Sequence, residues 1–152
     1  SHLWVARRAL TKATDPGKRD NLVGGGVPFG QSALETVVRE GWEEAGLTPA
    51  QMQAVQPGRV IDLDRDVAEG RQFERVHVFD LELPATCTPR NQDGEVESIE
   101  CLPVESAIAL AAGDEMTVDA ALVTLDFALR HRLLPAPEHE RLAAQMAPLW
   151  AG

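Results

Sequence analysis

Alternating apolar and polar positions predict β-strands in four parts of the chain. These segments are Leu3–Ala9, Arg59–Asp66, Gln72–Leu83 and Val96–Leu102. The second and third are joined by a short segment that contains a glycine, so we expect a hairpin. Residues 11–21, with Pro16 and Gly17 at their centre, predict a turn. Leu22 and Val23 then lead into the glycine-rich residues 24–30, which predict a short strand and a tight loop rather than a helix.

Apolar residues recur at helical spacing in several of the remaining segments. The clearest helix begins after Ser32, which predicts a capping box with Glu35, and ends before Gly46. A short helix is expected over residues 48–51, with Pro49 at its first position. Further helices are predicted over Val104–Ala112, Thr117–Leu133 and Glu138–Ala147. This order predicts one layered α/β or α+β domain over residues 1–152, built around a mixed sheet.

The composition narrows the class of ligand. Acidic residues outnumber lysine and arginine by 24 to 14, which gives a formal net charge of −10. This charge argues against duplex nucleic acid as a partner, because binding a phosphate backbone requires positive charge. A small phosphorylated ligand remains compatible, since a metal ion can supply positive charge locally. No run of ~18 apolar residues predicts a membrane span, and Cys87 and Cys101 lack metal-site spacing, so we expect a cytoplasmic protein with reduced thiols.

Three glutamates are crowded into the stretch "REGWEEAGL", residues 39–47. On a helical wheel Glu40, Glu43 and Glu44 form one cluster, which we expect on the face opposite the apolar residues, converging on one spot. The apolar face, expected to dock on the sheet, comprises Leu34, Val37, Val38, Gly41, Trp42 and Ala45. Like charges on a helix repel unless a cation binds them, and carboxylates suit magnesium. The alternative is a solvated acidic face.

The 23 residues from Gly25 to Leu47 resemble a Nudix box. The family pattern is a glycine, five residues, a glutamate, seven residues and then R-E-U-x-E-E-x-G-U, where U is aliphatic. Matching residues are Gly25, Arg39, Glu40, Glu43, Glu44, Gly46 and Leu47. Two positions depart from it, because Gln31 replaces the glutamate and Gly41 replaces an aliphatic residue.

The resemblance implies an α/β/α sandwich around a mixed sheet and metal-dependent hydrolysis of a diphosphate linked to another moiety. It implies that Glu40, Glu43 and Glu44, with the Gly25 carbonyl, hold Mg²⁺ or Mn²⁺. Arg39 would orient these carboxylates, and Gln31 would replace the glutamate that pairs with this arginine. The glycine at position 41 costs ~1 kcal/mol of helix propensity, and we expect it to make room for Trp42, which should face the core.

Residues outside the box complete the predicted site. The family often places a further acid where "QDGEVESIE" stands, so Glu95 and Glu97 are the candidates for the catalytic base, although either could be a solvated loop residue. Four basic residues near the glycine-rich loop are candidates for contacts with phosphates, with solvated surface charge as the alternative; they are Arg8, Lys12, Lys18 and Arg19. Phe29 could offer an aromatic face to an organic cation.

The flanking segments 2–26, 88–110 and 117–134 are similar to a Nudix subfamily related to thiamine pyrophosphokinase. This narrower resemblance implies a substrate like thiamine diphosphate, beside the nucleoside-diphosphate-like substrates of the wider family. It also implies that the chain is the C-terminal part of a longer protein whose N-terminal domain is absent. The strand-like start at Leu3 is consistent with this, but also with a short native or tag-derived start.

Two other functions remain open from the sequence. An enzyme like isopentenyl-diphosphate isomerase would need a histidine-rich metal site and a cysteine before the box, and neither residue type occurs between Leu3 and Gly25. The scattered histidines His77, His131 and His139 are expected at the surface or in packing. A Nudix-fold module that binds diphosphates without turnover is favoured by the two departures and disfavoured by the intact glutamates. The sequence leaves oligomerisation open.

Overall fold

The structure is a computed structural model that describes residues 1–151. Its strand ladders are antiparallel and form two sheets. The first has the order β2-β1-β5, formed by β1 (His2–Arg8), β2 (Arg19–Asn21) and β5 (Val96–Pro103). The second is the hairpin of β3 (Gln56–Val67) and β4 (Gly70–Asp80), and an isolated parallel bridge joins Arg19 to Met116.

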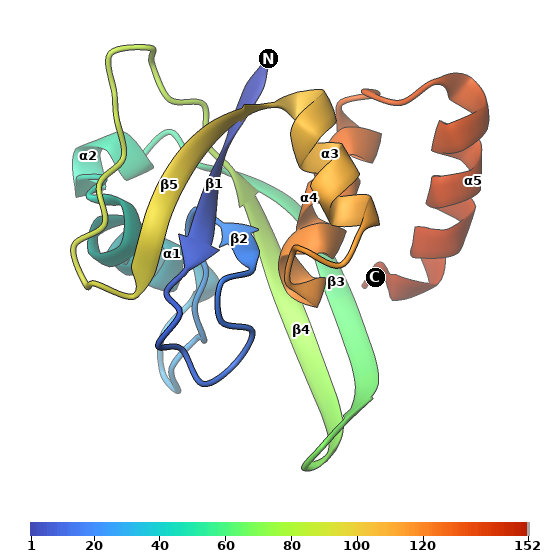
Figure 1. Cartoon of the computed structure of the whole chain (residues 1–152), viewed down its shortest axis with the longest axis horizontal. Helices are drawn as coiled ribbons and strands as arrows, with labels where there is room; N and C mark the ends of the chain where they lie inside the picture. The colour runs from blue at the N-terminus through green and yellow to red at the C-terminus, as the bar shows by residue number, and fades with distance from the viewer. Residues whose placement is uncertain (152) are drawn as a thin grey trace.

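The helices lie on both sides of the strands (Figure 1). On one side are α1 (Ala33–Ala45) and α2 (Pro49–Met52). On the other are α3 (Val104–Ala112), α4 (Val118–Arg130) and α5 (Ala136–Met146), followed by the 3-10 turn η1 (Ala147–Leu149). This arrangement of α and β layers confirms the predicted fold class. No helix in the described part of the chain is long and apolar enough to cross a membrane.

Three apolar clusters hold these layers together. The first packs α3 and α4 against β1, around Val5 and Ala107. The second packs α4 and α5 against the β3–β4 hairpin, around Ile61 and Leu129. The third surrounds the end of α1 and includes Met52 of α2. The helices are therefore fixed by their apolar residues against neighbouring layers, and α4 contributes to two of the clusters.

The predicted helix after Ser32 has the expected ends. The Ser32 hydroxyl accepts from the Glu35 N–H, and the Glu35 carboxylate accepts from the Ser32 N–H, which is the capping box. Gly46 is left-handed, with φ 66°, and its N–H donates to the Trp42 carbonyl. The loop before β5 pairs with the last carbonyls of α1, because the N–H groups of Arg90 and Gln92 donate to Ala45 and Glu43. Helix α1 is thus tied at both ends.

Some element boundaries differ from the prediction. Strand β2 lies at Arg19–Asn21, within the predicted turn, whereas the short strand expected at Leu22 and Val23 is absent. β2 is short and polar, with β1 as its strand partner on one side and the isolated bridge from Arg19 to Met116 on the other, so no apolar pattern marks it. Helix α4 ends at Arg130 rather than Leu133.

The prediction that Trp42 faces the core was wrong. Trp42 is 49% exposed and Leu34 is 52% exposed. The buried residues of α1 are Thr36, Gly41 and Ala45, so the helix contacts its neighbours along a line closer to the glutamates than expected. A Cβ built at Gly41 would lie 2.8 Å from the Met52 sulfur, so this glycine admits Met52 of α2 rather than Trp42.

Candidate active site

A pocket of about 270 Å³ lies where the end of β1, the glycine-rich loop, α1 and the start of β5 meet. Its lining contains four acidic and two basic side chains, and it includes the first glycines of the loop. The residues are Ala6, Arg8, Lys12, Asp20, Asn21, Leu22, Gly24, Gly25, Glu40, Glu44, Glu95 and Val96. Segments far apart in the sequence therefore contribute charged groups to one small concave surface.

Glu40 and Glu44, one turn apart on α1, face this pocket. The Glu44 carboxylate accepts a hydrogen bond of 2.7 Å from the Gly24 N–H. The Glu40 carboxyl group lies against Gly25, because a Cβ added there would be 2.7 Å from its carbon and Oε1 atoms. The absence of a side chain at position 25 thus allows the loop backbone to approach the carboxylates.

The environment of Glu44 is unfavourable for a negative charge. Burial raises the pKa of Glu44 to about 8, the Gly24 N–H opposes this rise, and the charges of Glu40, Asp93 and Asp20 add to it. Such crowding of carboxylates is the setting in which a bound cation lowers the energy of the folded protein.

Arg39 lies beside the carboxylates and has three polar partners. It donates to Gln31 Oε1 at 2.7 Å and to Glu40 Oε1 at 3.2 Å, and its Nε is 3.9 Å from Glu43 Oε1. Glu43 stands on the Arg39 side of the helix, outside the pocket lining, with 46% of its side chain exposed. Within residues 1–151, no three acidic, histidine or cysteine side chains form a group able to hold a metal ion.

The donor atoms of the pocket nevertheless suit a hard divalent cation. Carboxylate oxygens from Glu40 and Glu44 lie next to the backbone of Gly24 and Gly25. Oxygen ligands of this kind are preferred by magnesium, which commonly binds through one or two carboxylates and keeps several waters. Two protein carboxylates in the pocket are therefore sufficient for such an ion, and a third is within the same helix turn.

A β-bulge separates the two predicted candidates for the base. Along the β1–β5 ladder Arg7 pairs with Ser98 while Arg8 pairs with Val96, so Glu97 is the extra residue. Glu97 lies 3.7 Å from the Arg7 guanidinium and does not line the pocket. Glu95 does line it, and its carboxylate is 3.2 Å from Lys12 Nζ.

The structure also separates the predicted substrate residues. Arg8 and Lys12 line the pocket. Lys18 does not, and its amine is 3.7 Å from Asp15 in the preceding turn. Phe29 is fully exposed in the glycine-rich loop. Asp20 lines the pocket although sequence reasoning placed it in a turn without a role, and no sequence signal marks it.

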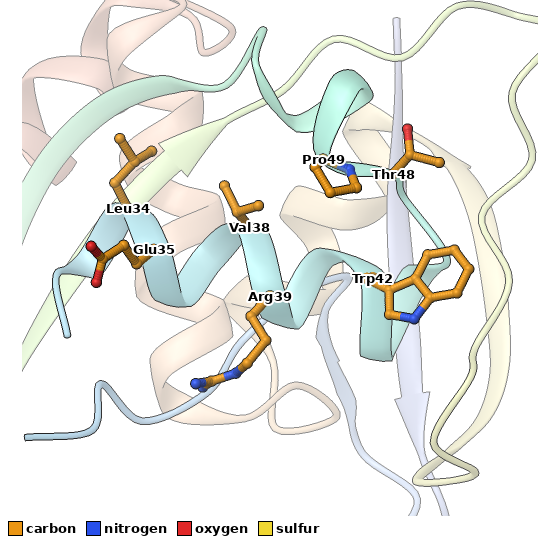
Figure 2. Close-up of a pocket in the computed structure, with 7 residues that line it drawn as sticks. All are labelled: Leu34, Glu35, Val38, Arg39, Trp42, Thr48 and Pro49. Carbon is orange, nitrogen blue, oxygen red and sulfur yellow. The ribbon is translucent and has the colours of Figure 1, made fainter.

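The opposite side of α1 carries an apolar groove that is distinct from the acidic pocket. Figure 2 shows Leu34 and Val38 on the side of the helix that faces Pro49, and Arg39 pointing away from them. Trp42 and Thr48 also line this groove. Helix α1 therefore presents Glu40 and Glu44 to the acidic pocket and its exposed apolar residues to a separate groove.

Comparisons with known proteins identify the family of this chain. The model of the NUDIX domain matches residues 1–123. Nudix hydrolase 24, chloroplastic, from Arabidopsis thaliana is 40% identical over 138 residues, covering 87% of this chain and 36% of that protein. Nudix hydrolase 20, chloroplastic, from the same plant is 41% identical over 133 residues, covering 85% and 35%. The chain thus spans about a third of the length of these curated relatives.

Solved structures show the same fold. A MutT protein from Methanosarcina mazei Go1 superposes with a TM-score of 0.61 at 22% identity, covering 84% of this chain and 83% of that one. DR0079 from Deinococcus radiodurans gives a TM-score of 0.60 at 26% identity, covering 81% and 72%. With a family model that matches most of its length, this chain belongs to the Nudix family, whose named relatives are hydrolases.

Proposed function

We propose that this chain hydrolyses a diphosphate bond in a small organic diphosphate, with a divalent cation. One observation carries the proposal: Glu40, Glu44, Gly25 and Glu95 line one pocket together with the cations Arg8 and Lys12. Diphosphate hydrolysis requires negative charge to be neutralised and a water molecule to be aligned with the bond that breaks. A pocket with both carboxylates and cations offers groups for each task.

Nudix hydrolases generally use divalent metals such as Mg²⁺. In this chain the ion, Mg²⁺ or Mn²⁺, would be held by Glu40, Glu44 and the Gly25 carbonyl, and Glu43 would join them by turning away from Arg39. When bound, it supplies charge neutralisation and lowers the pKa of coordinated water. Arg39, which hydrogen-bonds Gln31 and Glu40, would keep the Glu40 carboxylate in its orientation.

Glu95 is the residue we propose as the general base. Its carboxylate lies at the pocket edge, is 58% exposed and is paired with Lys12. In this role a carboxylate oxygen of Glu95 accepts a proton from the attacking water. Glu97 is the weaker candidate, since it pairs with Arg7 away from the pocket.

The proposed substrate is like thiamine diphosphate or a nucleoside diphosphate. A pocket of about 270 Å³ is below the usual range for a whole ligand, so it suits a diphosphate group whose organic part lies outside. Phe29, fully exposed in the adjoining loop, is a candidate to stack on that part. Because the curated relatives are about two and a half times as long, we also propose that a further N-terminal domain accompanies this one and contributes to substrate choice. A cytoplasmic location remains a prediction, since both Arabidopsis relatives are named as chloroplastic.

The test is magnesium-dependent release of phosphate products from a set of organic diphosphates. The variants Glu40→Gln and Glu44→Gln keep side-chain shape but weaken binding of hard cations, so turnover should fall by orders of magnitude. Glu35→Gln is the matched control on the same helix, because Gln also completes a capping box. Its turnover should equal that of the parent.

Full activity in the Glu40→Gln, Glu44→Gln double variant would refute the catalytic assignment. If the parent binds diphosphates with magnesium but hydrolyses none of them, the chain is a binding module instead. The isomerase alternative has no support from the pocket, whose lining includes neither histidine nor cysteine.

A further inference from the structure

The acidic pocket also contains two basic side chains, those of Arg8 and Lys12. Its lining carries Arg8 and Lys12 beside four carboxylate side chains, in a chain whose formal net charge is −10. Solvated surface charge would not require two basic side chains to converge on the same concave surface as Glu40 and Glu44. Their shared location is what a phosphate-bearing ligand would use.

Arg8 is held in place before any ligand arrives. Its Nε donates to the Thr14 carbonyl at 3.0 Å, and its Nη1 donates to Asp20 Oδ2 at 3.1 Å. Asp20 is fixed in turn, because its Oδ1 accepts from the Asn21 N–H. Within residues 1–151, Arg8 Nη2 donates to no protein atom. A guanidinium fixed on one edge retains donors for an anion, and phosphate suits its planar geometry.

Lys12 is placed differently. Its amine is 3.2 Å from Glu95 Oε2, a carboxylate that is more than half exposed. An exposed ion pair of this kind is weak and easily exchanged for a stronger anion such as phosphate. Exchange would also release Glu95, the proposed base, from its partner.

The neighbouring strand residue Arg7 is not part of this arrangement. Its Nε donates to the Gly17 carbonyl at 3.1 Å and lies 3.7 Å from Glu97. Arg7 does not line the pocket. Arg8 therefore lines the pocket and its neighbour Arg7 does not, so a substitution of Arg7 is a matched control for a substitution of Arg8.

We infer that Arg8 and Lys12 bind the phosphate oxygens of the substrate, with Arg8 as a fixed anchor and Lys12 as an exchangeable partner of Glu95. This inference rests on the proposed function, because it assigns the phosphate-binding residues of the same pocket. The ligand group recognised here is a diphosphate. It contacts Arg8 and Lys12 on one side of the pocket and faces Glu40 and Glu44 on the other. The organic part of the substrate plays no role in these contacts.

The experiment is calorimetric titration of the full chain with methylenediphosphonate, a diphosphate that cannot be hydrolysed, in the presence of Mg²⁺. Arg8→Gln and Lys12→Gln should each weaken its binding about 10- to 100-fold, as expected for the loss of a charge-assisted hydrogen bond. Arg8→Lys should fall between Arg8→Gln and the parent, because it keeps the charge but loses the planar fork. Arg7→Gln should bind the probe as the parent does.

Thermal unfolding of each variant separates a binding effect from a folding effect. Lys12 is the safer probe here, since its partner Glu95 is more than half exposed, and replacing Lys12 should leave the unfolding midpoint unchanged. Parent-like binding by the Arg8→Gln, Lys12→Gln double variant would overturn the inference. The inference would also be overturned if Arg7→Gln weakened binding of the probe as much as Arg8→Gln does, or if the parent did not bind the probe.

The outcomes also distinguish this inference from the proposed function. If the parent binds the probe through Arg8 and Lys12 but hydrolyses no diphosphate, the hydrolase proposal fails and the inference stands. If the parent is an active hydrolase but the double variant has unchanged KM and unchanged probe affinity, the inference fails and the hydrolase proposal stands.

Discussion

At the residue scale, Gly41 shows how a departure from a motif can be compensated by a neighbour. The Nudix pattern has an aliphatic residue here, yet a Cβ at position 41 would come within 2.9 Å of both the sulfur and the terminal carbon of Met52. Met52 is only 2% exposed, so its volume replaces the missing side chain. The sequence revealed the departure but not this partner, because Met52 belongs to a different helix.

Gly41→Ala should therefore lower the free energy of unfolding by about 1 kcal/mol. The gain in helix propensity, ~1 kcal/mol, is exceeded by the cost of overpacking against Met52. Combining it with Met52→Val should recover part of the loss, giving a coupling energy of about 1 kcal/mol in a double-mutant cycle measured by urea unfolding. Additive effects of the two substitutions would show that the two sites do not compete for space.

Glu44 makes the metal-free protein sensitive to pH. Its pKa is raised from 4.5 to about 8 in the folded state, mainly by burial. Between these pH values the folded state retains a proton that the unfolded state has lost, so stability falls as pH rises from 4.5 to 8. Glu44→Gln removes the titrating group and should remove this loss.

Thermal unfolding with EDTA at several pH values from 4.5 to 8.5 checks this expectation. At the upper pH the free energy of unfolding of the variant should exceed that of the parent by about 1–2 kcal/mol. This is less than the full pKa difference would give, because the carboxylate keeps part of its solvent contact. The two proteins should agree at pH 4.5. Parallel pH profiles would mean that the Glu44 carboxylate is not destabilised in the folded state.

At the element scale, the sequence predicted what local patterns encode. The ends of α1 followed from Ser32, Glu35 and Gly46, and alternation located β1, the β3–β4 hairpin and β5. The missed features depend on pairing between distant segments. β2 is a short polar strand, and the bulge at Glu97 arises only in the ladder with β1. Composition therefore could not separate Glu95 from Glu97, although one bulge decides which lines the pocket.

The β3–β4 hairpin is joined to α4 by a buried charge network. Arg130 donates to both carboxylate oxygens of Asp80 on β4, at 2.6 and 3.0 Å, and to Asp126 at 2.7 Å. Burial alone would raise the pKa of Asp80, but hydrogen bonds from Arg130 and His131 hold it below its usual value. Asp126 is fully buried, and its other cation, Arg59, lies 3.6 Å away without a hydrogen bond, so removing Arg130 would take away the hydrogen-bonded partner of this buried charge.

Arg130→Met should therefore cost about 3–5 kcal/mol of unfolding free energy. Arg71→Met is the matched control, because Arg71 also pairs bidentately with an aspartate, Asp64, on the same hairpin but is 74% exposed. Its cost should be below about 1 kcal/mol. Chemical denaturation of both variants checks the difference, and similar costs would contradict the assignment of Asp126 and Arg130 to a buried network.

At the scale of the whole molecule, net charge and pocket size together limit the substrate. A chain of formal charge −10 repels long polyanions, and a pocket of about 270 Å³ accepts little more than a diphosphate group. Neither property identifies the organic part of the substrate. We propose that the residues that select it lie in exposed segments such as the loop around Phe29, which no motif describes.

A comparison of kcat/KM at fixed magnesium tests this limit. Thiamine diphosphate analogues and ADP-ribose should be hydrolysed faster than nucleoside triphosphates and capped RNA. If capped RNA or a nucleoside triphosphate leads by more than about tenfold, ~1.4 kcal/mol of transition-state preference, the thiamine-type substrate is wrong. Hydrolysis of a diphosphate bond by the acidic pocket would still be consistent with that result.

The pairing between α1 and the loop before β5 has a consequence for protein engineering. The carbonyls of Glu43, Glu44 and Ala45 accept from the Gln92 N–H, the Asn91 side chain and the Arg90 N–H. The same loop continues directly into Glu95. A transplant of residues 25–47 into another scaffold would carry the motif but leave the last turn of its helix without these donors. A graft that keeps the end of this helix paired would need residues 90–95 as well, so the motif and this loop transfer together as two segments that are separated in sequence and joined by hydrogen bonds.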